Sequence, residues 1–302
     1  MEGLEGSLRA VTEPTSGATA RLALSDTRFG DVRWVAETGS TNQDVMELAR
    51  HGEPEGIVIV ADHQTAGRGR RGRTWEAPDG AALMATVLLR PWASVAGMTT
   101  MAVALAASEA IEELTGVVAQ VKWPNDLVWP GDGSLEDRKL AGILAEADWP
   151  AASHIAGGWQ PPEPGSRVVV AVGIGINVAW AGQMPPELAP TAVALDEILG
   201  PVPPPSREDL LIAFLRRLDD RYGLLMSKPE PGVVAPGVEA VRSGWEARSA
   251  TIGRRVRVDL GADDVVGTAV GLTGEGHLIV ETVEGERRTI AVGDVVHLRP
   301  AG

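Results

Sequence analysis

The segment richest in chemistry is residues 64–75, Gln64-Thr-Ala-Gly-Arg-Gly-Arg-Arg-Gly-Arg-Thr-Trp75. Its glycines let the backbone approach a ligand closely. The arginines Arg68, Arg70, Arg71 and Arg73 carry rigid guanidinium groups that suit phosphate or carboxylate, and Trp75 offers a flat face for a base or a cation. Because this mixture does not form an interior helix or a core strand, we predict a loop that an anion orders.

Two hydroxyls and an amide stand together at Ser40, Thr41 and Asn42, before apolar residues at helical spacing. Ser40 or Thr41 is a natural N-cap for that helix. The same groups at a helix start can also bind a small polar ligand, and this motif alone leaves both interpretations open.

A lysine and a carboxylate flank a kink at Lys122-Trp-Pro-Asn125-Asp126. Proline followed by Asn-Asp predicts a turn or a bulge that interrupts strand pairing, and a plain turn with a solvated Lys/Asp pair is the alternative. A later strand begins near Lys139, which taken alone is an ordinary solvated lysine. Gly142 follows in that strand, where a side chain would obstruct.

Residues 173–177, Gly-Ile-Gly-Ile-Asn177, end another predicted strand. They lack the third glycine and the following helix of a dinucleotide-binding fingerprint, so the Gly-Ile-Gly sequence is weak evidence for a nucleotide site by itself.

Hydrophobic periodicity indicates which elements carry these motifs. The expected strands are residues 31–37, 56–61, 83–89, 138–146 and 167–178, and the main expected helices are residues 97–114, 193–199 and 206–225 with another that reaches Trp245. Five short alternating runs between residues 254 and 299, separated by glycine-containing turns, predict a small antiparallel barrel. We therefore expect a weakly structured lead-in at 1–30, a catalytic domain at 31–250 and a C-terminal barrel at 251–302.

Composition excludes several classes of protein. The chain has 302 residues, of which 44% are hydrophobic, enough for one large and one small domain. It has no cysteine, which excludes disulfides and thiolate chemistry. A net charge of −14 argues against general binding to nucleic acid or to an anionic membrane. No stretch resembles a transmembrane helix or a signal peptide, so a cytoplasmic location is expected.

Along the chain, Ser40-Thr-Asn42 is followed by residues 64–73, then by Lys122-Trp-Pro-Asn-Asp126, and then by residues 138–144 with residues 173–177. These four motifs in this order resemble those of the biotin protein ligases, and the resemblance runs from about residue 33 to the C-terminus. It implies an α+β fold with a central mixed β-sheet flanked by helices, as in class II synthetases, and a C-terminal SH3-like β-barrel. It also implies the reaction: biotin and ATP form biotinyl-5′-adenylate, and a lysine of a biotin carboxyl carrier protein then attacks the mixed anhydride. Mg²⁺ would enter with the ATP phosphates.

The resemblance further implies roles for individual residues. The catalytic positions are Lys139, Arg70, Asp126 and Lys122. The biotin-binding positions are Ser40, Thr41, Asn42, Gln64, Gly67, Arg68, Gly69, Arg70, Lys139 and Gly142. The nucleotide-binding positions are Arg68, Arg71, Arg73, Trp75, Lys122, Asn125 and Asn177. Asp126 is either a general base toward the incoming lysine or a ligand of magnesium.

About 30 residues precede the catalytic region, too few for the helix-turn-helix domain that some family members carry. We therefore expect a ligase that binds no DNA and no membrane, as a monomer or a weak homodimer. A lipoate–protein ligase, a degenerate family member without activity and a non-catalytic RNA-binding protein are the competing hypotheses.

Overall fold

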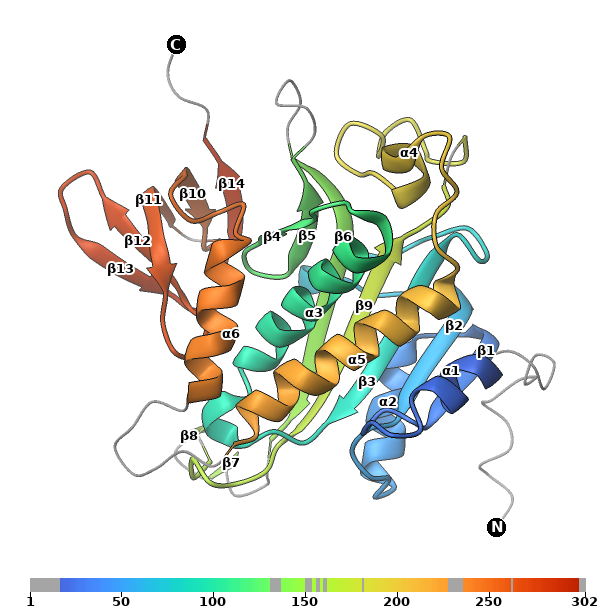
Figure 1. The fold of residues 1–302 in the computed structure, drawn as a ribbon. Coiled ribbons are helices and arrows are strands. Elements are labelled where there is room, and N and C mark those ends of the chain that lie inside the picture. The colour runs from blue at the N-terminus through green and yellow to red at the C-terminus, as the bar shows by residue number, and fades with distance from the viewer. Residues whose placement is uncertain are drawn as a thin grey trace.

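The computed structural model describes residues 17–130, 137–149, 154–155, 158–159, 162–180, 182–227, 236–261 and 263–298. Residues 1–16 of the expected lead-in, and parts of the segments 130–137 and 148–166, lie outside this part of the chain. The described residues confirm the predicted α+β fold, with a seven-stranded mixed sheet, helices on both of its faces and a five-stranded antiparallel sheet at the C-terminal end (Figure 1).

The large sheet has the strand order β1-β2-β3-β9-β6-β5-β4. β1 and β2 are parallel, and every other neighbouring pair is antiparallel. Its strands are β1 (Val32–Thr38), β2 (Val58–Gln64), β3 (Ala82–Leu89), β4 (Gln120–Lys122), β5 (Asp126–Trp129), β6 (Arg138–Asp148) and β9 (Val169–Asn177). The short β7 (His154–Ile155) and β8 (Gly158–Trp159) pair with each other outside this sheet.

The helices form layers on the two faces of the sheet. α3 (Met98–Thr115) and α5 (Arg207–Leu225) cross one face, with α6 (Pro236–Ala247) beside them, and α2 (Thr41–Arg50) covers part of the other (Figure 1). α1 (Ala18–Ala23) packs along α5, and α4 (Leu195–Leu199) follows β9. Short 3₁₀ turns occupy Arg70–Gly72 and Ala93–Val95. No described helix is long and apolar enough to cross a membrane.

Strand alternation in β9 determines where a ligand can enter. Successive side chains of a strand point to opposite faces. Val172, Ile174 and Ile176 therefore join the core under α3 and α5. Gly173 and Gly175 face the α2 side, so the middle of the sheet carries no β9 side chain on that face.

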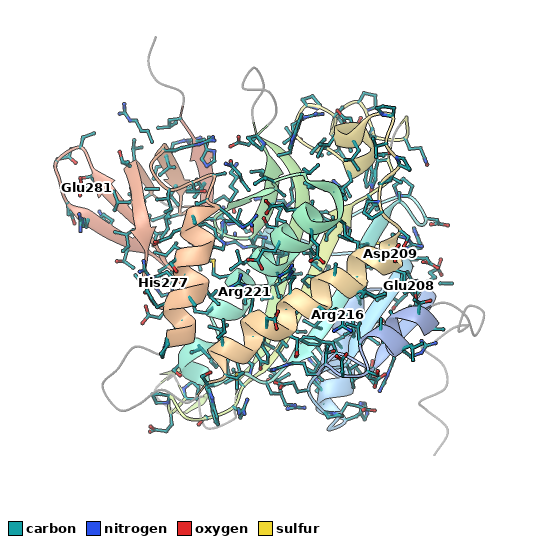
Figure 2. The ribbon with its side chains drawn as sticks, in the orientation of Figure 1. Glu208, Asp209, Arg216, Arg221, His277 and Glu281 are labelled. Carbon is teal, nitrogen blue, oxygen red and sulfur yellow. The ribbon has the colours of Figure 1, made fainter. Side chains whose placement is uncertain are left out.

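Residues 17–30 depart from the loosely ordered lead-in that we expected. Ala20, Leu24 and Phe29 have no exposed surface. Arg216 of α5 forms an ion pair with Asp26 at 3.2 Å, and Figure 2 shows this arginine on the side of α5 that faces the segment. Local periodicity was too weak to indicate this packing, because the contacts that order the segment come from residues nearly 200 positions away.

The C-terminal sheet comprises β10 (Arg255–Asp259), β11 (Asp264–Leu272), β12 (Leu278–Thr282), β13 (Arg287–Ile290) and β14 (Asp294–His297). Its strand order is β13-β12-β11-β10-β14, and all its neighbouring pairs are antiparallel. These strands coincide closely with the five predicted runs.

Hydrogen bonds attach the C-terminal sheet to the kink after β4. The indole N–H of Trp123 donates to the Gly276 carbonyl at 3.0 Å, and the Trp123 backbone N–H donates to the Thr251 hydroxyl at 3.2 Å. His297 on β14 contacts the Asp137 carboxylate through Nδ1 at 2.9 Å, and its Nε2 lies 3.4 Å from the Thr251 hydroxyl. The position of the kink therefore depends on the C-terminal sheet.

Burial, together with the nearby cations Lys122 and Arg254, lowers the pKa of His297 from 6.5 to about 4, although hydrogen bonding and the charge of Asp137 oppose this shift. The unfolded chain therefore binds more protons than the folded protein between these two pH values. The free energy of unfolding consequently falls as the pH falls through this window.

We predict that His297 alone lowers the free energy of unfolding by about 2 kcal/mol between about pH 7 and about pH 5. Denaturant melts of the wild type and of His297→Gln at both pH values measure this difference. The variant lacks the titrating ring and should lose about 2 kcal/mol less on acidification. If the free energy of unfolding fell equally in the two proteins on acidification, the lowered pKa of His297 would be contradicted.

Candidate functional site

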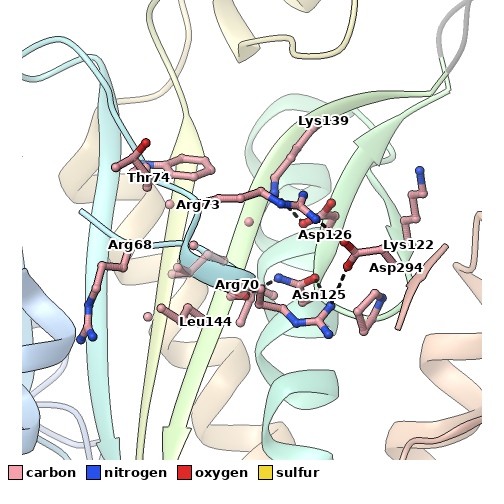
Figure 3. A pocket seen from close by; sticks show the side chains of 18 of the residues that line it. Arg68, Arg70, Arg73, Thr74, Lys122, Asn125, Asp126, Lys139, Leu144 and Asp294 are labelled. Carbon is pink, nitrogen blue, oxygen red and sulfur yellow. Dashed lines mark hydrogen bonds and ion pairs between the residues drawn. The ribbon is translucent and has the colours of Figure 1, made fainter. Parts of the chain in front are cut away.

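A cavity of about 440 Å³ opens on the face of the sheet that carries α2 (Figure 3). Its walls come from the start of α2, the Gly/Arg loop (residues 67–75), the β4–β5 kink, β6, β9 and the C-terminal sheet. The predicted site residues that line it are Ser40, Thr41, Asn42, Gln64, Arg68, Gly69, Arg70, Arg73, Trp75, Lys122, Asn125, Asp126, Lys139 and Gly142. Separate motifs thus meet in one space.

The floor of the cavity is made of glycines, and Trp75 rests on it. A Cβ at Gly175 would lie 2.5 Å from the Trp75 ring, and one at Gly142 would lie 3.1 Å from the same ring. The Lys139 ammonium is 5.7 Å from the ring centroid. No described residue accepts a hydrogen bond from the buried Trp75 indole N–H. The indole is therefore positioned by packing against the glycines and not by a hydrogen bond of its N–H group.

Polar side chains at the start of α2 form a buried network. Ser40 is the residue before the helix, yet its side chain makes no capping hydrogen bond. The Gln64 amide oxygen accepts from the Thr41 backbone N–H at 2.9 Å and lies 3.1 Å from the Thr41 hydroxyl. Thr86, on β3, places its hydroxyl 2.8 Å from both the Thr41 hydroxyl and the Asn42 amide oxygen. These hydrogen bonds hold the polar side chains at the start of α2 in fixed positions, which favours the interpretation that this motif binds a polar ligand.

Glu146 connects this network to the Gly/Arg loop. Its carboxylate accepts from the Asn42 amide at 2.9 Å and from the Arg68 guanidinium at 3.0 Å. It lies on β6, four residues after Gly142, and strand alternation puts both on the cavity side. Glu146 therefore helps to fix both the position of the Gly/Arg loop and the orientation of the Asn42 amide.

The other loop arginines turn toward the C-terminal sheet. Arg70 and Arg73 both point at Asp294, whereas Arg68 points the opposite way (Figure 3). Arg70 also donates to the Asn125 amide oxygen at 3.3 Å. Burial lowers the pKa of Arg70, and repulsion from Arg71 and Arg73 lowers it further. The negative charges of Asp294 and Asp126 oppose this shift.

Lys139 and Asp126 form an ion pair at 2.7 Å between β6 and β5. Their side chains are 33% and 27% exposed, so the pair is reachable from the cavity. The kink is a tight turn between β4 and β5, followed by a bulge at Leu127/Val128 in the pairing with β6. This geometry agrees with the predicted interruption of strand pairing.

Three predicted site residues do not line this cavity. Gly67 and Arg71 instead line a second hollow beside the loop. Asn177 is 4% exposed, and its amide donates to the Val193 carbonyl at 3.0 Å. Its observed contact is therefore with the segment before α4.

Among the residues that line or support the cavity but were not predicted as site residues, five have contacts that bear on the argument. They are Thr86, Glu146, Gly173, Gly175 and Asp294. Strand alternation along β6 and β9 was a usable signal for Glu146 and the two glycines. Nothing local marked Thr86 or Asp294, because their contacts with the site join strands that are distant in the sequence.

The described residues contain no group of three or more acidic or histidine side chains that could hold a metal ion. Asp126 was the candidate for magnesium, and its carboxylate is paired with Lys139. A lone, paired carboxylate can add one ligand to an ion held mainly by phosphates and water, which is how Mg²⁺ usually binds.

The fold and the site define a ligase of the biotin/lipoate type. Residues 34–154 match the model of the biotin/lipoate A/B protein ligase family, and residues 251–298 match that of the biotin protein ligase C-terminal domain. The chain belongs to the biotin protein ligase family, as the motifs indicated.

Relatives that are named as biotin ligases align with most of the chain. One is the biotin–[acetyl-CoA-carboxylase] ligase of Mycobacterium tuberculosis, 36% identical over 277 residues, 88% of each chain. Another is the ligase of the same name from Paracoccus denitrificans, 32% identical over 86% of this chain and 98% of the relative. The structure of biotin protein ligase from Aquifex aeolicus in complex with biotin and ATP is also similar, with a TM-score of 0.68 and 28% identity over 90% of this chain and 100% of the other.

We predict that Gly175→Ala weakens biotin binding about tenfold, because the added Cβ displaces Trp75 from the floor and overpacking of this kind costs about 1–3 kcal/mol. Calorimetric titration with biotin measures the change. Gly165→Ala is the matched control, since its Cβ meets open space. Equal affinity in both variants and the wild type would contradict the role of the glycine floor.

Proposed function

We propose that the protein activates biotin with ATP to form biotinyl-5′-adenylate and transfers the biotinyl group to a lysine of a biotin carboxyl carrier protein. The observation that carries this proposal is the meeting of separate motifs in one cavity, within a chain of the biotin protein ligase family. The names of the relatives support an acetyl-CoA carboxylase carrier as the acceptor.

In the first step, a biotin carboxylate oxygen attacks the α-phosphorus of ATP, and pyrophosphate leaves. Two anions must approach each other, so cationic groups are needed to neutralise their repulsion and the charge that develops. Lys139, Lys122 and Arg70 line the cavity and are suited to this role. The polar network around Thr41 and Asn42 is suited to the uncharged ring end of biotin.

In the second step, the carrier lysine amine attacks the carbonyl carbon of the mixed anhydride, and AMP leaves. The attacking amine must lose a proton. Asp126 is the carboxylate that lines the cavity beside Lys139, and we assign it as the proton acceptor or as a ligand of magnesium. The Gly/Arg loop would limit the access of water to the adenylate between the two steps.

Magnesium would enter with the nucleotide and offset the charge of its phosphates. The protein itself supplies positive charge beside these phosphates, because Arg68, Arg70 and Arg73 line the cavity. Asn125 helps to orient Arg70 through its amide oxygen.

The competing hypotheses have less support. A lipoate–protein ligase would share the match of residues 34–154, but the match of residues 251–298 is to a biotin protein ligase domain. In an RNA-binding protein the loop arginines would face solvent and contact phosphates along a strand. Arg68 and Arg70 instead pair with Glu146 and Asp294 around a cavity.

We predict that Lys139→Ala lowers the rate of adenylate formation by about 10²–10³-fold, the size of effect seen when one transition-state charge partner is removed. Pyrophosphate release in the presence of biotin and ATP measures this rate. Arg138→Ala is the control, because Arg138 pairs with Glu197 at 2.6 Å and does not line the cavity. Wild-type turnover in Lys139→Ala would make the site assignment wrong.

A further inference from the structure

The C-terminal sheet supplies a carboxylate to the Gly/Arg loop. Asp294, the first residue of β14, lies 3.5 Å from the Arg70 guanidinium and 3.4 Å from that of Arg71, and it also pairs with Arg73. The side chain of Asp294 is 27% exposed. One carboxylate from the small domain thus holds three arginines of a loop that lies far away in the sequence.

Further contacts hold the loop against the same sheet. Arg70 donates to the Gly293 carbonyl at 3.3 Å, and Arg71 donates to the Asp259 carbonyl at 3.1 Å. Arg71 is the one described non-glycine residue with a positive φ, 55°. A left-handed conformation costs such a residue about 1–2 kcal/mol, so the contacts with the sheet must stabilise this arrangement of the loop.

Charge compensation in this cluster is incomplete. Three guanidinium groups share Asp294, and within the described part of the chain only Arg71 pairs with a second carboxylate, that of Asp259 at 3.6 Å. The guanidinium fork binds phosphate as it binds carboxylate. A polyphosphate in the cavity would therefore compete with Asp294 for Arg70 and Arg73, the two of these arginines that line it.

We propose that Asp294 is an internal counter-ion of the nucleotide site, which holds the cavity-lining Arg70 and Arg73 in the free protein and gives them up when a polyphosphate binds. This inference rests on the proposed function, since it takes the phosphates of ATP as the competing anion. Asp294 acts through the arginines and is a positioning residue. The C-terminal sheet thereby sets how tightly the catalytic domain binds nucleotide.

Removing the charge of Asp294 should tighten binding of a polyphosphate. If the arginines are released in about 10–20% of free molecules, Asp294→Asn should lower the Kd about five- to tenfold. Calorimetric titration of the full chain with inorganic tripolyphosphate, without biotin, measures this change. A purely structural role predicts the opposite sign, because a disturbed loop binds less tightly.

Two variants serve as controls. Glu281→Gln removes the same charge from the same sheet, but Glu281 lies on the outer hairpin (Figure 2) and pairs with Arg287 at 3.1 Å. Because exposed ion pairs contribute little energy, the Kd of this variant for tripolyphosphate should stay within about twofold of the wild-type value. Asp294→Glu retains the competing charge and should retain weaker, wild-type-like binding. It also tests the inference if Asp294→Asn does not fold, because tighter binding by Asp294→Glu would overturn it.

The outcomes separate this inference from the proposed function. Equal or weaker tripolyphosphate binding by Asp294→Asn, in a background where the wild type binds ATP and biotinylates a carrier, overturns the counter-ion role alone. Absence of both ATP and tripolyphosphate binding in the wild type overturns the proposed function and this inference together.

Discussion

The arrangement of the site depends on the pairing of cations that would otherwise repel one another. Arg68, Arg70, Arg73, Lys122 and Lys139 line one cavity, in a protein whose net charge is −14. Glu146, Asp126 and Asp294, each from a different strand, pair with four of these five cations. Since like charges repel one another more strongly when they are partly buried, these carboxylates offset the repulsion among the cations around the cavity. The same pairing leaves the site ready for anions, because phosphate or carboxylate groups of a substrate can take the place of the internal carboxylates.

A second constraint is steric. The sheet can hold an indole and a ligand on its α2 face because glycines interrupt the side chains of β6 and β9 there. Gly173 is as restricted as Gly175, since a Cβ at Gly173 would overlap the Asn42 amide. The glycines, the buried network and the paired cations therefore provide a shaped floor, a neutral polar end and a charged end. This division matches the parts of biotin and ATP that the proposed reaction must bring together.

The resemblance of the motifs predicted the fold class. Hydrophobic periodicity predicted most strands and the main helices, because alternating and helical periodicities are local properties of the chain. The resemblance also predicted most cavity-lining residues, since the motifs are short and their order is specific. Local patterns could not predict that residues 17–30 pack against α5, or that Asn177 bonds to Val193. Asp294 gave no local signal either, because a single acidic residue in a short strand acquires its role only when the C-terminal sheet meets the loop. The roles assigned to individual site residues stay predictions.

The central claim is tested most directly by transfer of labelled biotin, with ATP and magnesium, to a purified biotin carboxyl carrier domain, with lipoate and a lipoyl domain in a parallel reaction. We expect label on the biotin carrier, no label on a carrier whose target lysine is replaced, and no transfer of lipoate. Transfer of lipoate instead would assign the protein to the lipoate ligases. Transfer of neither, by a protein that is folded and binds ATP, would contradict the proposed ligase activity.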